Sequence, residues 1–188
     1  MKSVLISIQP QWCELIASGK KTIEVRKSAP KEVPFKAYIY ETKAGFVEAV
    51  RGTCPRCAFS RGKVIGEFVC DKVYDLFPWG IGVCATDERG ELVIPDVIRN
   101  NSCLTDDEIC EYLNNRAGKA WHISDLKIYD KPKELSDFSK YGYKYLGGCC
   151  VNNNCKNYVY NGYYQPPECK IDGCFFKRPP QSWCYVEG

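Results

Sequence analysis

A short segment near the N-terminus, residues 19–27, gathers the side chains best suited to chemistry. Within it, residues 22–27 alternate between polar and apolar types, which predicts a strand with Glu24 and Arg26 on one face. Lys21 lies at the start of this strand. A lysine beside other cations loses its proton more readily and can act as a base, whereas a nearby carboxylate has the opposite effect. Lys21 and Glu24 are therefore candidate catalytic residues; the alternative is a solvated strand face with an ordinary, weak ion pair.

A second group of candidates combines polar and aromatic residues on two further predicted strands, at residues 120–124 and 181–186. Alternation places His122, the only histidine, on the same face as Ser124. Such a face can stack a planar base and hydrogen-bond its edge. The alternative is a core histidine with one satisfied nitrogen, beside tryptophans that only fill volume. The candidate nucleic-acid-binding residues are Lys20, Arg26, Lys27, His122, Ser124, Gln181, Ser182 and Trp183.

Four cysteines towards the C-terminus form two pairs of equal C-x4-C spacing, separated by thirteen residues. Zinc takes four soft ligands in a tetrahedron, and two short-spaced pairs brought together by a loop can supply them. We therefore predict a structural zinc site with Cys149 as a spare ligand. Cys54 and Cys57, at the tighter C-x2-C spacing, could supply one pair instead, or could form a loop motif without a role. The predicted ligands are Cys150, Cys155, Cys169 and Cys174.

Other local patterns predict the elements that hold these residues in place. Pro10 suits the first turn of a helix that follows a strand at residues 3–8, and Gly19 suits the end of that helix. Thr105 and Glu108 have the spacing of a capping box, which predicts a second helix that begins near residue 106 and ends by residue 118. Further strands are expected at residues 35–42, 63–73, 120–124, 126–129 and 181–186, and a loop at residues 43–62.

Composition limits the domain organisation and the compartment. The chain has 188 residues, of which 45% are hydrophobic, enough to bury the core of one domain. Residues 141–178, rich in Cys, Asn, Gly, Tyr and Pro, are predicted to be an insertion into a domain formed by residues 1–140 and 179–188. Thirteen cysteines, an odd number, exclude full disulfide pairing. The apolar run at residues 4–8 is too short for a signal-peptide core, and no run approaches the length of a membrane span, so we expect a cytoplasmic protein with reduced thiols.

The charge of the chain is unevenly distributed. Its formal net charge is +3, a value that excludes neither a nucleic acid nor an acidic partner. Residues 1–43, however, contain eight lysines or arginines and only four acidic residues. This local excess favours a phosphate-bearing ligand near Lys21 and Arg26.

The segment from Gly19 to Arg26 resembles the G-x-K-x-x-E-x-R signature of ASCH domains, which belong to the PUA-like superfamily. The order of segments is also similar: an opening strand and helix, then the segments at residues 62–67, 120–123 and 180–183. The resemblance implies an α+β fold, a small, partly closed, mixed β-barrel flanked by helices, with a cleft that meets RNA or a modified nucleobase. Functions assigned to similar ASCH proteins are RNA binding, ribonuclease activity and amide hydrolysis of acetylated cytidine.

Position by position, the resemblance assigns the family's lysine to Lys21, its acidic residue to Glu24 and its arginine to Arg26. In the small amidohydrolase members a threonine nucleophile occupies the place held here by Glu24. This departure argues against threonine-based acyl transfer.

Three functions remain open at this point. The first is an RNA- or nucleotide-binding module in which Lys21 and Arg26 contact phosphate and Glu24 orients a base. The second is a hydrolase acting on a modified nucleoside or RNA, with Lys21 as base and Glu24 as acid or water-orienting group. The third is an accessory module that binds a protein partner through the cysteine-rich insertion, whose tyrosines are typical of interfaces. These tyrosines are Tyr158, Tyr160, Tyr163 and Tyr164.

Overall fold

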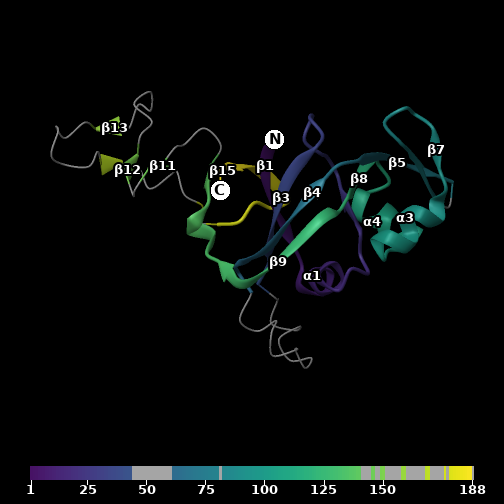
Figure 1. The fold of residues 1–188 in the computed structure, drawn as a ribbon. Helices are drawn as coiled ribbons and strands as arrows, with labels where there is room; N and C mark the ends of the chain where they lie inside the picture. The colour runs from purple at the N-terminus through teal and green to yellow at the C-terminus, as the bar shows by residue number, and fades with distance from the viewer. Residues whose placement is uncertain are drawn as a thin grey trace.

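Two β-sheets form the body of the fold (Figure 1). The computed structural model describes residues 1–43, 61–80, 82–140, 176 and 178–187, together with four two-residue strands between residues 145 and 169. The larger sheet has the strand order β10-β15-β1-β3-β4-β9, and the smaller has the order β2-β8-β5-β6-β7. The strands are β1 (Lys2–Ile8), β2 (Ile23–Arg26), β3 (Phe35–Glu41), β4 (Val64–Cys70), β5 (Val73–Trp79), β6 (Gly82–Thr86), β7 (Leu92–Val93), β8 (Gly118–His122), β9 (Ser124–Lys133), β10 (Ser139–Lys140), β11 (Tyr145–Leu146), β12 (Cys149–Cys150), β13 (Tyr158–Val159), β14 (Glu168–Cys169) and β15 (Trp183–Glu187).

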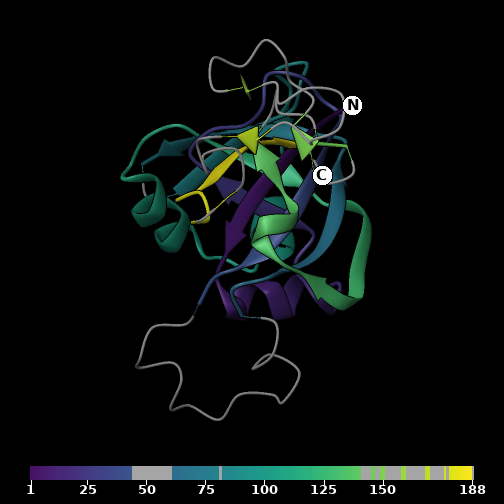
Figure 2. The same ribbon diagram turned by 90° about the vertical axis from the view of Figure 1, so that its left-hand side faces the viewer.

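Strand β1 lies inside the larger sheet, parallel to β3 and antiparallel to β15, so the first and last strands are neighbours (Figure 2). Its last five residues are buried, which agrees with the apolar run at residues 4–8. Parallel neighbours cannot be joined by a tight turn and need a crossover connection. The crossover from β1 to β3 contains α1 (Pro10–Ala17) and then β2, which belongs to the other sheet. Between β1 and β3 the chain therefore leaves the larger sheet, and residues 23–26 form a strand of the smaller one.

Local sequence explains how α1 begins and ends. Pro10 occupies the first turn of the helix, where its missing N–H leaves no hydrogen bond unmade. Gly19 follows the helix with φ = 73°, a left-handed conformation that glycine adopts without steric cost. The backbone N–H groups of Lys20 and Lys21 then donate to the Leu15 carbonyl oxygen, which closes the helix end and directs the chain into β2.

Two short helices, α3 (Pro95–Ser102) and α4 (Asp106–Leu113), pack on the smaller sheet and bury the apolar face of β2. The predicted capping box is confirmed: the Thr105 hydroxyl accepts from the Glu108 N–H, and the Glu108 carboxylate accepts from the Thr105 N–H. The predicted alternation of β2 is also confirmed. Its apolar residues pack against both helices in a cluster that contains Ile23, Val25, Leu76, Val83, Ala85, Ile98, Ile109, Leu113 and Ala120.

A second apolar core lies between the two sheets. Trp121 of β8 is fully buried there, with its ring centroid 4.9 Å from that of Phe35 in β3 and 5.7 Å from that of Trp183 in β15. Both contacts are edge-on, a favourable arrangement for aromatic rings. Trp121 therefore links the strand that pairs with β2 to the larger sheet.

Several sequence expectations need correction. The single strand expected at residues 63–73 is two strands, β4 and β5, because Asp71 and Lys72 separate them and they join different sheets. The helix α4 ends at Leu113 rather than near residue 118, since Asn114 adopts a left-handed conformation. Strands β5 to β7 beyond residue 73, and helix α3, were not anticipated. Among the described strands no pairing joins the two sheets, so the α+β class is confirmed but closure into a barrel is not.

The segment at residues 141–178 falls largely outside the described residues, and the predicted domain boundaries stay a prediction. Within it, β11 pairs with β12 and β13 pairs with β14, all antiparallel. The backbones of β12 and β14 lie close together. Of the helices in the described ranges, none has the length and apolar character needed to cross a membrane.

Candidate functional site

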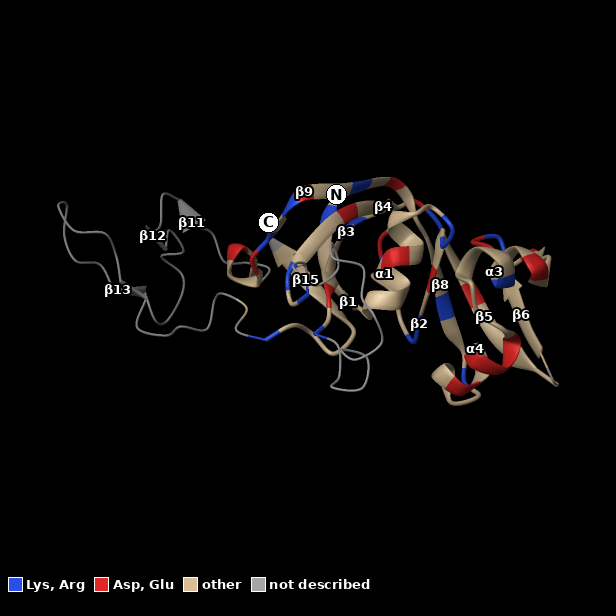
Figure 3. Ribbon diagram, turned by 90° about the horizontal axis from the view of Figure 1, so that it is seen from below, with Lys and Arg blue, Asp and Glu red and all other residues tan. Residues whose placement is uncertain are grey.

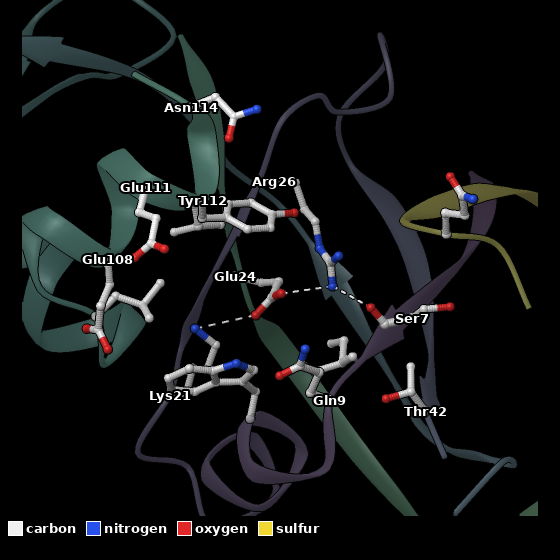
Figure 4. Close-up of a pocket in the computed structure, with 15 residues that line it drawn as sticks. Ser7, Gln9, Lys21, Glu24, Arg26, Thr42, Glu108, Glu111, Tyr112 and Asn114 are labelled. Carbon is white, nitrogen blue, oxygen red and sulfur yellow. Dashed lines mark hydrogen bonds and ion pairs between the residues drawn. The ribbon is translucent and has the colours of Figure 1, made fainter. Parts of the chain in front are cut away.

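Three charged side chains of the motif segment are buried next to one another. The side chains of Lys21, Glu24 and Arg26 retain 2%, 8% and 8% of their exposure. An Arg26 guanidinium nitrogen lies 2.9 Å from Glu24 Oε1, and Lys21 Nζ lies 3.4 Å from Glu24 Oε2. Glu24 therefore lies between two cations (Figure 4). The alternative of a solvated strand face is wrong, and the residues form a buried Lys21-Glu24-Arg26 triad.

Backbone carbonyl groups from two other elements hold the cations in place. Lys21 Nζ donates to the carbonyl oxygen of Ser102 at 2.5 Å, and Ser102 is the last residue of α3. This bond satisfies a terminal helix carbonyl and places a positive charge at the negative end of the helix dipole. The Arg26 guanidinium donates to the carbonyl oxygen of Ser7 at 2.7 Å, at the end of β1. The triad thus connects both sheets and α3.

The triad lines a cavity of about 790 Å³ whose walls come from β1, α1, β2 and α4 (Figure 4). This volume lies in the range of about 300–1,000 Å³ that is typical of small-molecule sites. Trp12 of α1 and Tyr112 of α4 are the aromatic residues of the lining. Lys21 Nζ lies 5.1 Å from the centroid of Trp12, within the range of a cation–π contact.

Two buried polar atoms of the triad have unused hydrogen-bonding capacity. Within the part of the chain that the structure describes, Glu24 Oε2 and Arg26 Nε have no hydrogen-bond partner. Oε2 is an acceptor that needs a donor, whereas Nε is a donor that needs an acceptor. Buried polar atoms are nearly always hydrogen-bonded, so a ligand that offers both functions would complement this wall of the cavity.

The cavity is not strongly positive. Besides the triad, its lining includes two carboxylates of α4, Glu108 and Glu111, so three carboxylates accompany two cations. Hydrogen bonds from the Thr105 backbone and hydroxyl hold the pKa of Glu108 below its usual value, which keeps this side chain ionised. Figure 3 shows the acidic residues of α4 in red.

Some of the other predicted binding residues lie at or near the cavity. Gln181 lines the cavity, and Lys27 lies at its edge, with Nζ 5.6 Å from the Tyr112 ring centroid. Lys20 is exposed and precedes the triad directly. The Ser182 carbonyl accepts from the Ser7 N–H and supports β1.

Three of the predicted residues lie elsewhere. Trp183 packs against Trp121 and donates to the Ser28 hydroxyl at 3.2 Å. His122 and Ser124 do not line the cavity. His122 Nδ1 lies 2.6 Å from an Asp71 carboxylate oxygen, and the Ser124 hydroxyl donates to the Val69 carbonyl. His122 has one satisfied nitrogen, as the alternative interpretation required, but its side chain is 34% exposed rather than in the core.

Sequence reasoning did not assign Trp12, Tyr112 or Ser7 to the site. Trp12 and Tyr112 belong to the apolar stripes of the two predicted helices, and a stripe residue is normally taken as core. Both rings instead line the cavity, with Trp12 half-buried and Tyr112 38% exposed. The Ser7 contribution is a backbone carbonyl, for which no side-chain pattern exists.

The predicted zinc ligands are not described at the level of side chains. Cys150 and Cys169 lie in β12 and β14, and Cys155 and Cys174, like Cys54 and Cys57, lie outside the described residues. Among the side chains that are described, no cluster of three or more potential metal ligands occurs. Six other cysteines are free thiols. They are Cys13, Cys70, Cys84, Cys103, Cys110 and Cys184.

An ion pair between α3 and α4 supports the cavity wall and gives a pH-dependent prediction. Arg99 of α3 donates to both carboxylate oxygens of Asp106 at 2.7 and 2.6 Å, which lowers the pKa of Asp106 from its ordinary value of 3.8. A carboxylate with a depressed pKa contributes stability above its unfolded-state pKa, and this contribution is lost as the pH falls through the folded-state pKa.

We expect Asp106→Asn to lower the free energy of unfolding by about 1 kcal/mol at neutral pH, a small effect because Arg99 is partly exposed. Urea unfolding of both proteins from neutral pH downwards measures this difference. The difference should begin to shrink as the pH falls below about 4. A difference that stays constant as the pH falls well below that value would contradict the assignment.

Comparison with known proteins assigns the chain to a protein family. The sequence profile of the ASCH domain matches residues 6–100, about half of the chain, and this range includes the whole triad. The chain belongs to the ASCH family. Among the curated proteins, none matches this ASCH sequence significantly.

One solved structure agrees with the ASCH assignment at the level of fold. The crystal structure of ASCH from Zymomonas mobilis has a TM-score of 0.51 and 16% identity, covering 99% of this chain and 88% of that one. A point mutant of the same Zymomonas mobilis protein has a TM-score of 0.49 and 15% identity, covering 99% and 89% of the two chains. At this identity the likeness to the first structure establishes a shared ASCH fold.

Proposed function

We propose that the cavity of this ASCH domain binds one nucleotide of single-stranded RNA, with the base against the Lys21-Glu24-Arg26 triad. The observation that carries the proposal is a pair of buried polar atoms without a hydrogen-bond partner among the described residues, Glu24 Oε2 and Arg26 Nε, in the wall of a cavity with two aromatic residues. The edge of a nucleobase offers both donors and acceptors, and its face stacks on aromatic rings. Membership of the ASCH family supports the same ligand class.

The charges of the lining refine how the RNA would bind. Lys21 and Arg26 both contact Glu24 and a backbone carbonyl, so they are poorly placed to serve mainly as phosphate ligands. Their role is to hold the carboxylate and to complete the base-binding wall. Exposed lysines beside the cavity, such as Lys20 and Lys27, are better placed than the triad for contacts to the RNA backbone.

Removal of the Tyr112 ring tests this proposal. Tyr112 is partly exposed, so Tyr112→Ala should fold. Stacking on an aromatic ring contributes about 1–3 kcal/mol per base, so the affinity for a short single-stranded RNA should fall about tenfold or more. Titration of the wild type and of Tyr112→Ala with a fluorescently labelled RNA measures this change in affinity.

Trp79→Ala is the matched control for Tyr112→Ala, because Trp79 is 77% exposed and does not line the cavity. Binding by the control should equal that of the wild type. Absence of RNA binding by the wild type, or equal losses in the two variants, would overturn the proposal.

A second candidate function is hydrolysis of a modified nucleoside or of RNA in the same cavity. It is favoured by the 3.4 Å separation of Lys21 Nζ and Glu24 Oε2, since a cation next to a carboxylate oxygen that accepts no hydrogen bond within the described residues can position a water molecule. Incubation with acetylated cytidine and with RNA, beside a Glu24→Gln control, separates hydrolysis from binding. Product that appears with the wild type and not with Glu24→Gln, under conditions in which circular dichroism shows both proteins to be folded, would support it. No turnover of either substrate by the wild type would exclude it.

We also propose that the cysteine-rich segment binds one structural zinc ion. The support is the close approach of β12 and β14, which brings the backbones of Cys150 and Cys169 near one another. Elemental analysis should find about one zinc per chain in the wild type, and in a Cys84→Ser control. The metal should be lost in Cys150→Ser/Cys169→Ser, because tetrahedral zinc needs all four ligands.

A wild-type protein purified without zinc, and unable to take it up on titration, would contradict the metal proposal. The use of this segment as a surface for a protein partner stays a prediction, since its tyrosine side chains are not described.

A further inference from the structure

A second cavity, of about 460 Å³, lies next to the base-binding cavity. Its lining includes Tyr40, Lys43 and the segment around Arg178. Thr42 lines both cavities, and it lies on the side of the first cavity that is opposite α4 (Figure 4). The two cavities are therefore adjacent rather than separate features of the surface.

A short stretch of chain spans the two cavities. Arg178 lines the second cavity and Gln181 the first. Only two residues lie between them, so their Cα atoms are at most about 11 Å apart even in a fully extended chain. Thr42, which lines both cavities, and Lys43, which lines the second, are consecutive and so about 3.8 Å apart at Cα. One extended ligand can therefore reach from the triad to the cations of the second cavity.

The second cavity differs from the first in charge. Its cations, Lys43 and Arg178, are both exposed, and neither has an ion-pair partner within the described ranges of the chain. The acidic residue of the lining, Glu134, is already paired with Lys63 at 2.8 Å. The first cavity has an excess of carboxylates over cations, whereas the second has two cations available for an anion.

One of the two cations lies against a neighbouring glycine, and a tyrosine hydroxyl adds a hydrogen-bond donor to the cavity. The side chain of Lys43 lies against Gly62, where an added Cβ would come within 2.9 Å of its Cε atom. Burial raises the pKa of Tyr40, so its hydroxyl keeps the proton and can donate to an anion. A phosphodiester group has the charge and the acceptor oxygens that these side chains require.

We infer that the second cavity binds the phosphodiester adjoining the base held at the triad, so that the protein recognises a dinucleotide unit of single-stranded RNA rather than a free nucleoside. This inference rests on the proposed function of the first cavity. In this arrangement Lys43 and Arg178 bind the phosphate, and the bound molecule is an RNA chain rather than a single nucleoside.

Calorimetric titration of the full chain with the four nucleosides and with the dinucleotides ApA, CpC, GpG and UpU at low salt tests the inference. A charged hydrogen bond to phosphate changes affinity by about tenfold or more, so the best dinucleotide should bind at least about tenfold more tightly than its nucleoside. Lys43→Ala/Arg178→Ala should remove most of this advantage without changing the affinity for the nucleoside. Lys31→Ala/Arg89→Ala, two exposed cations away from both cavities, is the matched control and should behave as the wild type.

The possible results distinguish this inference from the proposed function. If nucleosides and dinucleotides bind equally well, or if Lys43→Ala/Arg178→Ala keeps the advantage of the dinucleotide, the phosphate site is wrong while the base site stands. If no nucleoside and no dinucleotide binds, the proposed function itself fails. Circular dichroism of the double variant shows whether it is folded before it is titrated.

Discussion

Glu24→Gln is expected to lower the free energy of unfolding by about 3–5 kcal/mol, the usual cost of removing one partner from a buried ion pair. The Glu24 side chain is 8% exposed and is the only carboxylate within ion-pair distance of Lys21 and Arg26 among the described residues. Glutamine keeps the size of the side chain but removes its charge. Two cations then remain in a poorly solvated site without a counter-charge, and this accounts for the size of the effect.

Urea unfolding followed by circular dichroism measures the effect of Glu24→Gln. The matched control is Glu88→Gln, because Glu88 is exposed and lies in the turn before β7. Its stability should stay within about 0.5 kcal/mol of the wild type. A loss below about 1 kcal/mol for Glu24→Gln, with an unchanged denaturant slope, would mean that the triad is well solvated, and the buried-site account would fail.

Trp121→Ala is the second change with a large expected effect, a loss of about 3–5 kcal/mol. Trp121 is fully buried between the two sheets and contacts Phe35 and Trp183 edge-on. It also lies opposite Glu24 in the β2–β8 register, so both side chains are on the same face of the smaller sheet. A cavity in place of this ring removes packing directly behind the triad.

Trp121→Ala should therefore disturb the binding site as well as lower the free energy of unfolding. Trp79→Ala removes an exposed ring of the same type and should change stability by no more than about 0.5 kcal/mol. Thermal unfolding of both variants provides the comparison. Similar melting temperatures for the two variants would contradict the placement of Trp121 between the sheets.

Local patterns in the sequence predict those parts of the fold that depend on neighbours in the chain. The capping box at Thr105 locates the start of α4, and the alternation of residues 22–27 separates Glu24 and Arg26 from Ile23 and Val25. Alternation also separates Trp121 from His122 correctly. Each of these features has a period or a motif that requires no tertiary contact.

The sequence does not reveal which face of a strand meets the ligand or which distant groups complete the site. Alternation predicts a polar face with His122 and Ser124 in the cleft, but the cavity lies on the other face of β8, where Glu24 and Trp121 point. Ser124 is not in that strand at all, because it begins β9 of the larger sheet. The carbonyl partner of Lys21 is Ser102, 81 residues away, on a helix that no pattern had indicated. Such contacts are set by the packing of two sheets, and no local period encodes them.

The β4–β5 boundary shows the same limit at a smaller scale. Alternation over residues 63–73 gives two faces that are both mostly apolar, which is typical of one central strand. The chain instead leaves the larger sheet at Cys70 and enters the smaller sheet at Val73. The Cys70 thiol is directed to the Lys72 carbonyl oxygen at 3.2 Å, and Asp71 contacts His122, so the two intervening residues are held at the junction of the sheets.

The central claim is that RNA enters the cavity built around the Lys21-Glu24-Arg26 triad, and photo-cross-linking tests it most directly. Single-stranded RNA that contains thiouridine would be irradiated in complex with the full chain, and the cross-linked peptides would be identified by mass spectrometry. The account predicts cross-links in the peptides that contain Trp12 and Tyr112, and their loss when unlabelled RNA competes. Cross-links confined to other surfaces, such as the exposed ring of Trp79, would contradict it.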